Sequence, residues 1–208
     1  MPVATFPLGP LQTNSYLFHH QGQAIAVDVG GDPAPMLEYL KGHSLQLAAI
    51  CLTHRHFDHL YGVAELAQAS QAPVYISADE DCLAGTEASD GGIWGFPRVT
   101  PFESLPMPQG TVQLGNMACR VLPTPGHTPG GVSLYFPEHN LIFTGDTLFY
   151  RSIGRSDFPG GDLQTLLRSV REQLFSLPDE TLVYPGHGPA TTIGDERHNN
   201  PFCGEFAE

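Results

Sequence analysis

Basic residues are scarce in this sequence. Nine of its 208 residues are Lys or Arg, against 22 Asp and Glu, which gives a formal net charge of −13. Proteins that hold nucleic acid regardless of sequence place clustered Lys and Arg against the phosphates, and docking on an anionic membrane surface uses the same residues. We therefore expect neither nucleic acid nor a membrane among the partners.

Long apolar runs and paired cysteines are also missing. No stretch approaches the ~18 uninterrupted apolar residues of a membrane span. The cysteines Cys51, Cys82, Cys119 and Cys203 show no C-x-x-C spacing, and Cys51 and Cys119 lie in apolar runs, where we expect small core side chains. No Lys or Arg precedes Lys41, so the basic start of a secretory signal is lacking. These features predict a cytoplasmic protein with reduced thiols.

Glycine and proline are abundant by contrast. The chain has 23 Gly and 19 Pro, and they interleave with short apolar runs instead of forming a low-complexity tract. A chain of this length buries roughly 70% of the surface that is exposed when it is unfolded, which is enough for a hydrophobic core without stabilising disulfides. Because no segment resembles a linker, we expect a single domain over residues 1–208.

Strand and helix signals alternate in both halves of the chain. Apolar runs between turn residues predict strands at 14–19, 23–28, 48–53, 73–77, 111–114, 117–124, 132–136, 141–144 and 181–184. Helical spacing predicts helices at 35–42, 58–70 and 162–174, and Gly and aromatic residues predict a long surface loop at 87–101. Strands before helices in each half favour an α/β fold of two similar packed layers with helices outside.

Potential metal ligands crowd one turn. His54, His56, Asp58 and His59 fall within six residues, directly after an apolar strand. Such groups are costly to bury without partners, whereas imidazole and carboxylate are the ligand types of Zn²⁺, Fe²⁺ and Mn²⁺. The pattern therefore predicts a metal site better than a solvated polar turn.

Three later strand ends each offer one more ligand in a Gly-containing turn. They carry His127 in P-G-H-T-P-G, Asp146 in G-D-T and His187 in P-G-H-G. Glycine permits tight turns and a close approach of the backbone to a ligand. Five His and two Asp exceed what one tetrahedral ion needs, so we predict two metal ions that share a carboxylate.

These four motifs, in this order, resemble the metallo-β-lactamase superfamily from Thr53 to Gly188. The resemblance implies an αββα four-layer sandwich with a dinuclear site at one edge of the sheets. Zn²⁺ is the expected metal, with Fe and Mn as alternatives. The implied ligands are His54, His56 and His127 for one ion, Asp58, His59 and His187 for the other, and Asp146 as the bridge.

A closer resemblance is to the short, single-domain type II glyoxalases, or hydroxyacylglutathione hydrolases. It rests on the segments 145–149, 154–162 and 196–202. The full-length enzymes continue into a C-terminal helical domain that holds much of the glutathione site. This chain ends 21 residues after His187, so we expect no such domain here.

The resemblance implies hydrolysis of a small-molecule thioester of the S-lactoylglutathione type. A hydroxide that bridges the two metals would attack the carbonyl, and Asp58 would both bind metal and orient the nucleophile. Arg155, Arg151 and Tyr150 follow the bridging Asp146 and are predicted to contact the substrate, because Arg can hold a carboxylate bidentately. For the two arginines, the alternative is a surface ion pair with Asp157 or Asp162.

Hydroxyls beside the predicted ligands form a further expectation. Thr53 and Thr128 are adjacent to His54 and His127 in the sequence and are predicted to hydrogen-bond the imidazoles. Trp94 and Phe96 are predicted to lie at the mouth of the site.

Other activities fit the same motifs. Persulfide dioxygenases share the opening motif but bind one iron through two His and one Asp. A lactone or other ester hydrolase would share both the fold and the ligands.

Overall fold

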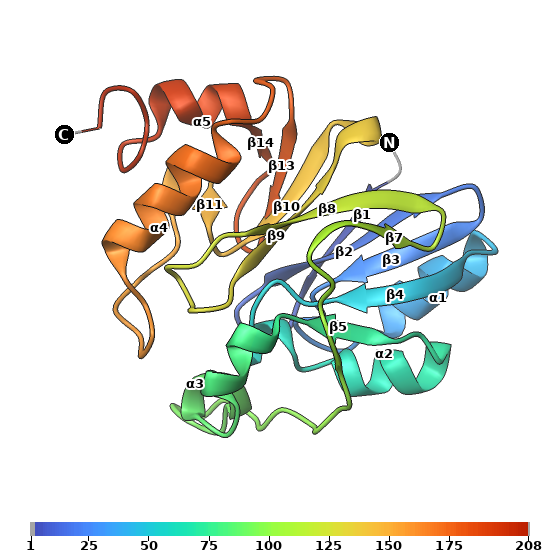
Figure 1. Ribbon diagram of the computed structural model, residues 1–208. Helices are drawn as coiled ribbons and strands as arrows, with labels where there is room; N and C mark the ends of the chain where they lie inside the picture. Colours follow the sequence, from blue (N-terminus) through green and yellow to red (C-terminus); the bar gives the residue numbers. More distant parts are fainter. Residues whose placement is uncertain (1–2, 208) are drawn as a thin grey trace. The chain divides into compact units, whose positions relative to one another are not determined.

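The computed structural model describes residues 3–207 and divides into two compact units, each with a mixed sheet and its own helices (Figure 1). The first unit runs to Met107 and includes Gln113–Met117, and the second comprises Pro108–Val112 and the chain from Ala118 onward. The expected α/β architecture is confirmed by these two sheets. One domain over residues 1–208 stays a prediction.

The first sheet has six strands in the order of the sequence. Two antiparallel pairings join β1, β2 and β3, and parallel pairings join β3, β4, β5 and β6. Helices α1 (Ala34–Gly42) and α2 (Val63–Ser70) lie in two of the parallel crossovers. The strands are β1 (Val3–Leu8), β2 (Thr13–His20), β3 (Gln23–Val27), β4 (Gln46–Cys51), β5 (Val74–Ile76) and β6 (Leu105–Pro106).

The core of the first unit lies between this sheet and its helices. Met36 and Leu40 of α1 and Val63 and Leu66 of α2 are buried against strand residues such as Ile50. This packing fixes the carboxyl ends of the parallel strands β3 and β4. The loops that leave those ends carry the first group of predicted ligands.

The second sheet has the order β14-β13-β10-β9-β8-β7, with β10 and β13 parallel. A small hairpin, β11 (Leu148–Phe149) and β12 (Ser152–Ile153), follows β10. Helices α4 (Leu163–Ser169) and α5 (Ile193–Asn199) complete the unit. The strands are β7 (Gly110–Leu114), β8 (Met117–Pro123), β9 (Val132–Phe136), β10 (Leu141–Gly145), β13 (Leu182–Pro185) and β14 (Thr191–Thr192).

The helix predicted at 58–70 is shorter than expected. A separate 3₁₀ turn, Phe57–His59, precedes it, and α2 begins only at Val63 with Gly62 as its N-cap residue. The reason is a tertiary contact: the Asp58 carboxylate accepts a hydrogen bond from the distant Thr13 hydroxyl and does not cap a helix. The prediction that Asp58 begins the helix was wrong.

The segment predicted as a long loop, 87–101, is partly ordered by its own hydrogen bonds. It contains the short helix α3 (Glu87–Asp90) and an isolated bridge between Gly91 and Arg98. Phe96 packs on Phe57 with ring centroids 5.4 Å apart. Trp94 stands out from it, 74% exposed.

Two further findings concern burial. Cys51 and Cys119 are fully buried, which confirms the expectation that they are core residues. Within residues 3–207, none of the helices has the length and apolar character that crossing a membrane requires.

Candidate metal centre

The first group of ligand candidates lies on the turn that follows β4. His54, His56, Asp58 and His59 are all buried there. The imidazoles of His54 and His56 meet edge to face with ring centroids 4.8 Å apart, and the ring centroids of His54 and His59 are 4.2 Å apart. Nε2 of His59 is 3.6 Å from Oδ2 of Asp58. The sequence prediction that these side chains gather is therefore correct within the first unit.

Asp28, at the end of β3, organises this turn. Its buried carboxylate accepts hydrogen bonds from the Thr53 backbone N–H and from the Thr53 hydroxyl, both at 2.8 Å. Its Oδ2 also lies 2.8 Å from Nδ1 of His59. Because a carboxylate only accepts, the His59 ring donates through Nδ1 and presents the lone pair of Nε2.

The same reasoning fixes the orientation of His54. The Thr53 hydroxyl donates to Asp28, so it accepts from Nδ1 of His54, which is 3.0 Å away. The predicted contact between Thr53 and an imidazole is thereby confirmed. Thr128 differs, since its buried Oγ1 has no hydrogen-bond partner among the described residues.

Two more residues hold the turn from either side. The Thr13 hydroxyl, on β2, donates to Oδ2 of Asp58 at 2.9 Å. Glu80, in the 3₁₀ helix Ala78–Leu83, is fully buried and accepts the backbone N–H of Arg55 at 2.6 Å. Arg55 lies between His54 and His56, so Glu80 fixes the backbone that carries both ligand candidates.

The second group lies at three strand ends of the other sheet. His127 follows β8, Asp146 follows β10 and His187 follows β13. Because β10 and β13 are parallel neighbours, their carboxyl ends place Asp146 and His187 side by side. Oδ2 of Asp146 lies 3.6 Å from Nε2 of His127 and 3.6 Å from Nε2 of His187.

These separations match ligands of a common ion better than hydrogen bonds. Hydrogen bonds of this kind are ~2.7–3.2 Å long, whereas ligands at ~2.1 Å from a tetrahedral ion lie ~3.4 Å from one another. Nδ1 of His127 is 2.6 Å from the carbonyl oxygen of Arg155, so this ring also donates through Nδ1 and presents Nε2. The Asp146 oxygen is therefore placed to share an ion with His127 and to share an ion with His187.

Gly154 allows the chain to pass close to Asp146. A methyl group at this position would overlap the backbone carbonyl oxygen of Asp146 and come within 3.2 Å of Nδ1 of His127. Because Gly154 has no side chain, the strand β12 and the loop after it can lie close to Asp146 and His127.

The chemistry of the donors fits a divalent metal. Each group combines imidazole nitrogens with carboxylate oxygen, the set that suits Zn²⁺, Fe²⁺ and Mn²⁺. Three of the five imidazoles are turned by a hydrogen bond at Nδ1 so that the lone pair of Nε2 is available to a metal. Each unit thus contributes a preformed half of the predicted ligand set.

Arg155, a predicted substrate contact, is engaged with Asp157. Its Nε and Nη2 each donate to the Asp157 carboxylate at 2.7 Å, and its guanidinium lies 3.8 Å from the Phe158 ring centre. The hydrogen bonds from Arg155 lower the pKa of Asp157 to about 2. The side chain of Arg155 is nevertheless 54% exposed, so a ligand can reach it. A role in substrate binding stays a prediction.

Arg151 and Tyr150 lie at the turn of the β11–β12 hairpin. The guanidinium of Arg151 pairs with Glu196 at 2.8 Å and with Asp195 at 3.0 Å, and not with Asp157 or Asp162 as the sequence suggested. Tyr150 is 47% exposed, and its ring lies 4.7 Å from the same guanidinium.

Sequence reasoning missed the supporting carboxylates Asp28, Glu80 and Glu196. Asp28 carried a signal, since it directly follows an apolar strand and precedes Gly30-Gly31. Glu196 falls in a segment that resembles the short glyoxalases, but its contacts with Arg151 join residues 45 positions apart. Such a separation leaves no periodic trace in the sequence.

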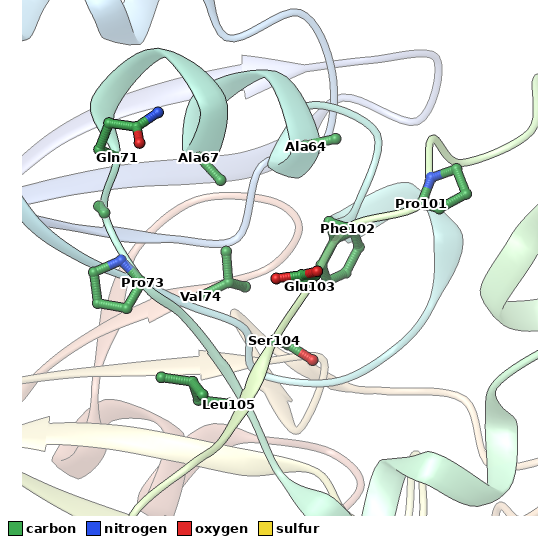
Figure 2. Close-up of a pocket in the computed structure, with 11 residues that line it drawn as sticks. Ala64, Ala67, Gln71, Pro73, Val74, Pro101, Phe102, Glu103, Ser104 and Leu105 are labelled. Carbon is green, nitrogen blue, oxygen red and sulfur yellow. The ribbon is translucent and has the colours of Figure 1, made fainter.

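A separate pocket lies in the first unit, between α2 and the segment that leads into β6 (Figure 2). Its volume is about 450 Å³, and Figure 2 shows apolar side chains together with the polar Gln71 and Ser104 and the charged Glu103. It contains none of the ligand candidates. The lining comprises Ala64, Ala67, Gln71, Ala72, Pro73, Val74, Pro101, Phe102, Glu103, Ser104 and Leu105.

Comparison with known proteins bears on both sequence and fold. A probable metallo-hydrolase of Bacillus subtilis, YqgX, is 38% identical over 97% of each chain. The hydroxyacylglutathione hydrolase GloC of Haemophilus influenzae is 33% identical over 97% of this chain and 98% of its own.

Two solved structures are similar over nearly their full length. The BLEG-1 B3 metallo-beta-lactamase is 37% identical with a TM-score of 0.90, covering 97% of this chain and 99% of its own. TTHA1623 in a di-iron-bound form is 41% identical with a TM-score of 0.85, covering 96% and 99%. The sequence profile of the metallo-beta-lactamase superfamily matches residues 8–187 of this chain, a span that contains every ligand candidate. The sequence of the chain, its fold and the order of its ligand motifs together show that the chain belongs to the metallo-β-lactamase superfamily.

Proposed function

We propose that this chain is a metal-dependent hydrolase that cleaves a thioester of the S-lactoylglutathione type. The observation that carries this proposal is the 33% identity, over nearly all of both chains, to a relative named hydroxyacylglutathione hydrolase. An acyl group on the sulfur of glutathione is a thioester, so that name specifies the bond that is cleaved. The His and Asp groups described above would provide ligands for the metal such a reaction uses.

Two divalent ions are proposed for the ligand set predicted from the sequence. Support comes from Asp146, whose Oδ2 is equidistant from Nε2 of His127 and of His187. Zn²⁺ is the proposed metal, and iron is the alternative because a relative has been solved in a di-iron-bound form. The proposed ligands are His54, His56 and His127 for one ion, Asp58, His59 and His187 for the other, and Asp146 between them.

The residues of the chain would bind and orient, while the bound ions supply the Lewis acidity. Such ions lower the pKa of a bound water toward ~7 and polarise a carbonyl group. Asp58, held in place by Thr13, would accept a hydrogen bond from the attacking water and orient it. The water gives up one proton to the solvent and its oxygen bonds to the acyl carbon. The carbon–sulfur bond then breaks with its electron pair on sulfur, and a hydroxy acid and a thiolate leave. A thiol with a pKa of ~8.5 needs no dedicated acid to depart.

Arg155 is the proposed contact for the carboxylate or amide oxygen of the substrate. Its ion pair with Asp157 is exposed on both sides, and such pairs contribute little to stability, so a substrate carboxylate can take the place of Asp157. Tyr150 is a second proposed contact because its ring is exposed beside the same segment. Arg151 is not included among the proposed substrate contacts, because its guanidinium is paired with Asp195 and Glu196.

Metal analysis combined with an anaerobic assay tests this function. We expect close to two ions per chain, and hydrolysis of S-lactoylglutathione without oxygen that stops when a chelator removes the metal. Asp58→Ala should abolish most activity and lower the metal content, while Asp179→Ala, at an exposed acid of the other unit, should change neither.

Two results would overturn the assignment. Oxygen uptake with glutathione persulfide, together with one iron per chain and no thioester cleavage, would identify a sulfur oxygenase. Hydrolysis of a β-lactam such as nitrocefin at a rate above that of any thioester would identify a β-lactamase.

A further inference from the structure

The carboxylate of Glu196, on α5, is fully buried and receives four hydrogen bonds. Oε1 accepts from Nη1 of Arg151 at 2.8 Å and from the Thr191 hydroxyl at 2.7 Å. Oε2 accepts from the backbone N–H of Arg151 and from Nδ2 of Asn200, both at 2.8 Å. A buried charge is costly unless it is paired and hydrogen-bonded, and here both oxygens are satisfied.

These bonds fix the turn of the β11–β12 hairpin. Arg151 occupies that turn with a φ of +54°, a conformation that L-residues with a side chain adopt at a cost. Glu196 binds both its backbone and its guanidinium, so the carboxylate offsets that cost. Asn200 adds a bond of 3.0 Å from Nδ2 to the carbonyl oxygen of Ser152.

The hairpin contacts His187, the loop after it contacts His127, and the hairpin follows Asp146 directly in the chain. It begins two residues after Asp146, and the carbonyl of Leu148 accepts from the Thr144 hydroxyl at 2.9 Å. The ring of Phe149 meets that of His187 edge to face at 6.1 Å. Beyond β12, the carbonyl oxygen of Arg155 lies 2.6 Å from Nδ1 of His127.

We propose that Glu196 is a positioning residue for the metal ligands of the second unit. It acts through the Arg151 turn: with the hairpin fixed, Phe149 sets the His187 ring and the carbonyl of Arg155 sets the His127 ring. Arg151 thereby acquires a supporting role, and its contact with the substrate stays a prediction. The inference rests on the metal-binding part of the proposed function and is independent of which bond is cleaved.

The test is Glu196→Gln, which keeps the size of the side chain but turns an amide N–H₂ toward donors. The metal-free variant and wild type are titrated with Co²⁺, and the visible spectrum of the bound ion reports ligand geometry. We expect ~10–100-fold weaker Co²⁺ binding, as for other residues that orient ligands, together with an altered spectrum. Hydrogen exchange at residues 148–153 of the metal-free protein should be faster.

Matched variants separate positioning from general stability. Glu172→Gln, at an exposed acid in the same unit, should match wild type in all three measurements. Glu196→Asp keeps the charge and should recover part of the affinity. If Glu196→Gln fails to fold, Arg151→Met breaks the same link from the partly exposed side and should reproduce the spectral change.

An unchanged Co²⁺ spectrum and affinity in both Glu196→Gln and Arg151→Met would overturn the inference, even if the thermal midpoint fell. This outcome differs from failure of the proposed function. If only the proposed function fails, the wild-type protein would bind Co²⁺ and Glu196→Gln would weaken that binding as expected, yet neither protein would cleave thioesters.

Discussion

Asp58, proposed to bind metal and orient water, is held by Thr13, which lies 45 positions earlier in the chain. Thr13→Val keeps the branched shape of the side chain but removes the hydroxyl that donates to Oδ2 of Asp58. Thr13 is fully buried, so water cannot readily supply the missing donor. We expect metal affinity to fall ~10–100-fold, as measured by competition with a chromophoric chelator.

Thr5→Val provides the control, because Thr5 is exposed on the neighbouring strand β1. It should leave metal affinity at the wild-type value. Equal affinity in Thr13→Val would mean that the hydroxyl does not orient Asp58 for metal binding.

The cysteines make a second prediction at this scale. Burial raises the pKa of the Cys119 and Cys203 thiols to about 12, and Cys51 is buried as well, whereas Cys82 is exposed. The thiolate is the reactive form, so at pH 8 only Cys82 should react with Ellman's reagent in the native protein.

All four thiols should react in denaturant. A second fast thiol in the native state would show that one of the buried cysteines becomes accessible without unfolding, contrary to the packing described here.

Among the elements, the β11–β12 hairpin and the loop after it depend most on a missing side chain. Gly154→Ala would press a methyl group onto the backbone carbonyl of Asp146, and backbone moves less easily than the end of a side chain. We expect a loss of about 1–3 kcal/mol in the free energy of unfolding, measured by denaturant titration, and weaker metal binding.

Gly42→Ala serves as the comparison. Gly42 ends α1, and a methyl group there would meet no other atom within 4 Å. Alanine is the better helix former, so this variant should be neutral or up to ~1 kcal/mol more stable. Wild-type stability and metal binding in Gly154→Ala would show that the segment can shift without cost.

Elements with a clear period or a clear boundary could be predicted from the sequence. The strands at β2, β3, β9 and β10 lie within one or two residues of their predicted bounds. The ligand candidates could be placed at strand ends because each follows an apolar run and a glycine lies nearby. The strands β1 and β14 and the helix α5 were not anticipated, since they are short or mixed in character.

The supporting contacts could not be predicted. Asp28 is 25 residues from Thr53, and Glu196 is 45 residues from Arg151. In both cases the partner is a backbone N–H as well as a side chain, and any residue has such a group. Sequence pattern therefore identifies the ligands better than the residues that orient them.

At the scale of the whole molecule, bound metal should stabilise the fold. Metal that binds the native chain more tightly than the unfolded chain adds about 2.7 kcal/mol when its free concentration is a hundred times its dissociation constant. Removal by a chelator should therefore lower the thermal midpoint by several degrees, as measured by scanning calorimetry.

Adding Zn²⁺ back should restore the midpoint, and Asp58→Ala should show a smaller shift than wild type. Identical midpoints with and without metal would contradict a structural contribution from the centre.

The parallel pairing of β3 and β4 has a practical consequence for labelling the protein. Their carboxyl ends lead to Asp28 and Thr53, whereas the tight turn at Gln21-Gly22 joins β2 to the opposite, amino end of β3. A strand of five residues separates the two ends by about 17 Å, and the Gln21 side chain at this turn is exposed. A fluorophore attached to residue 21 would therefore report on the first sheet from a point remote from its ligand turn.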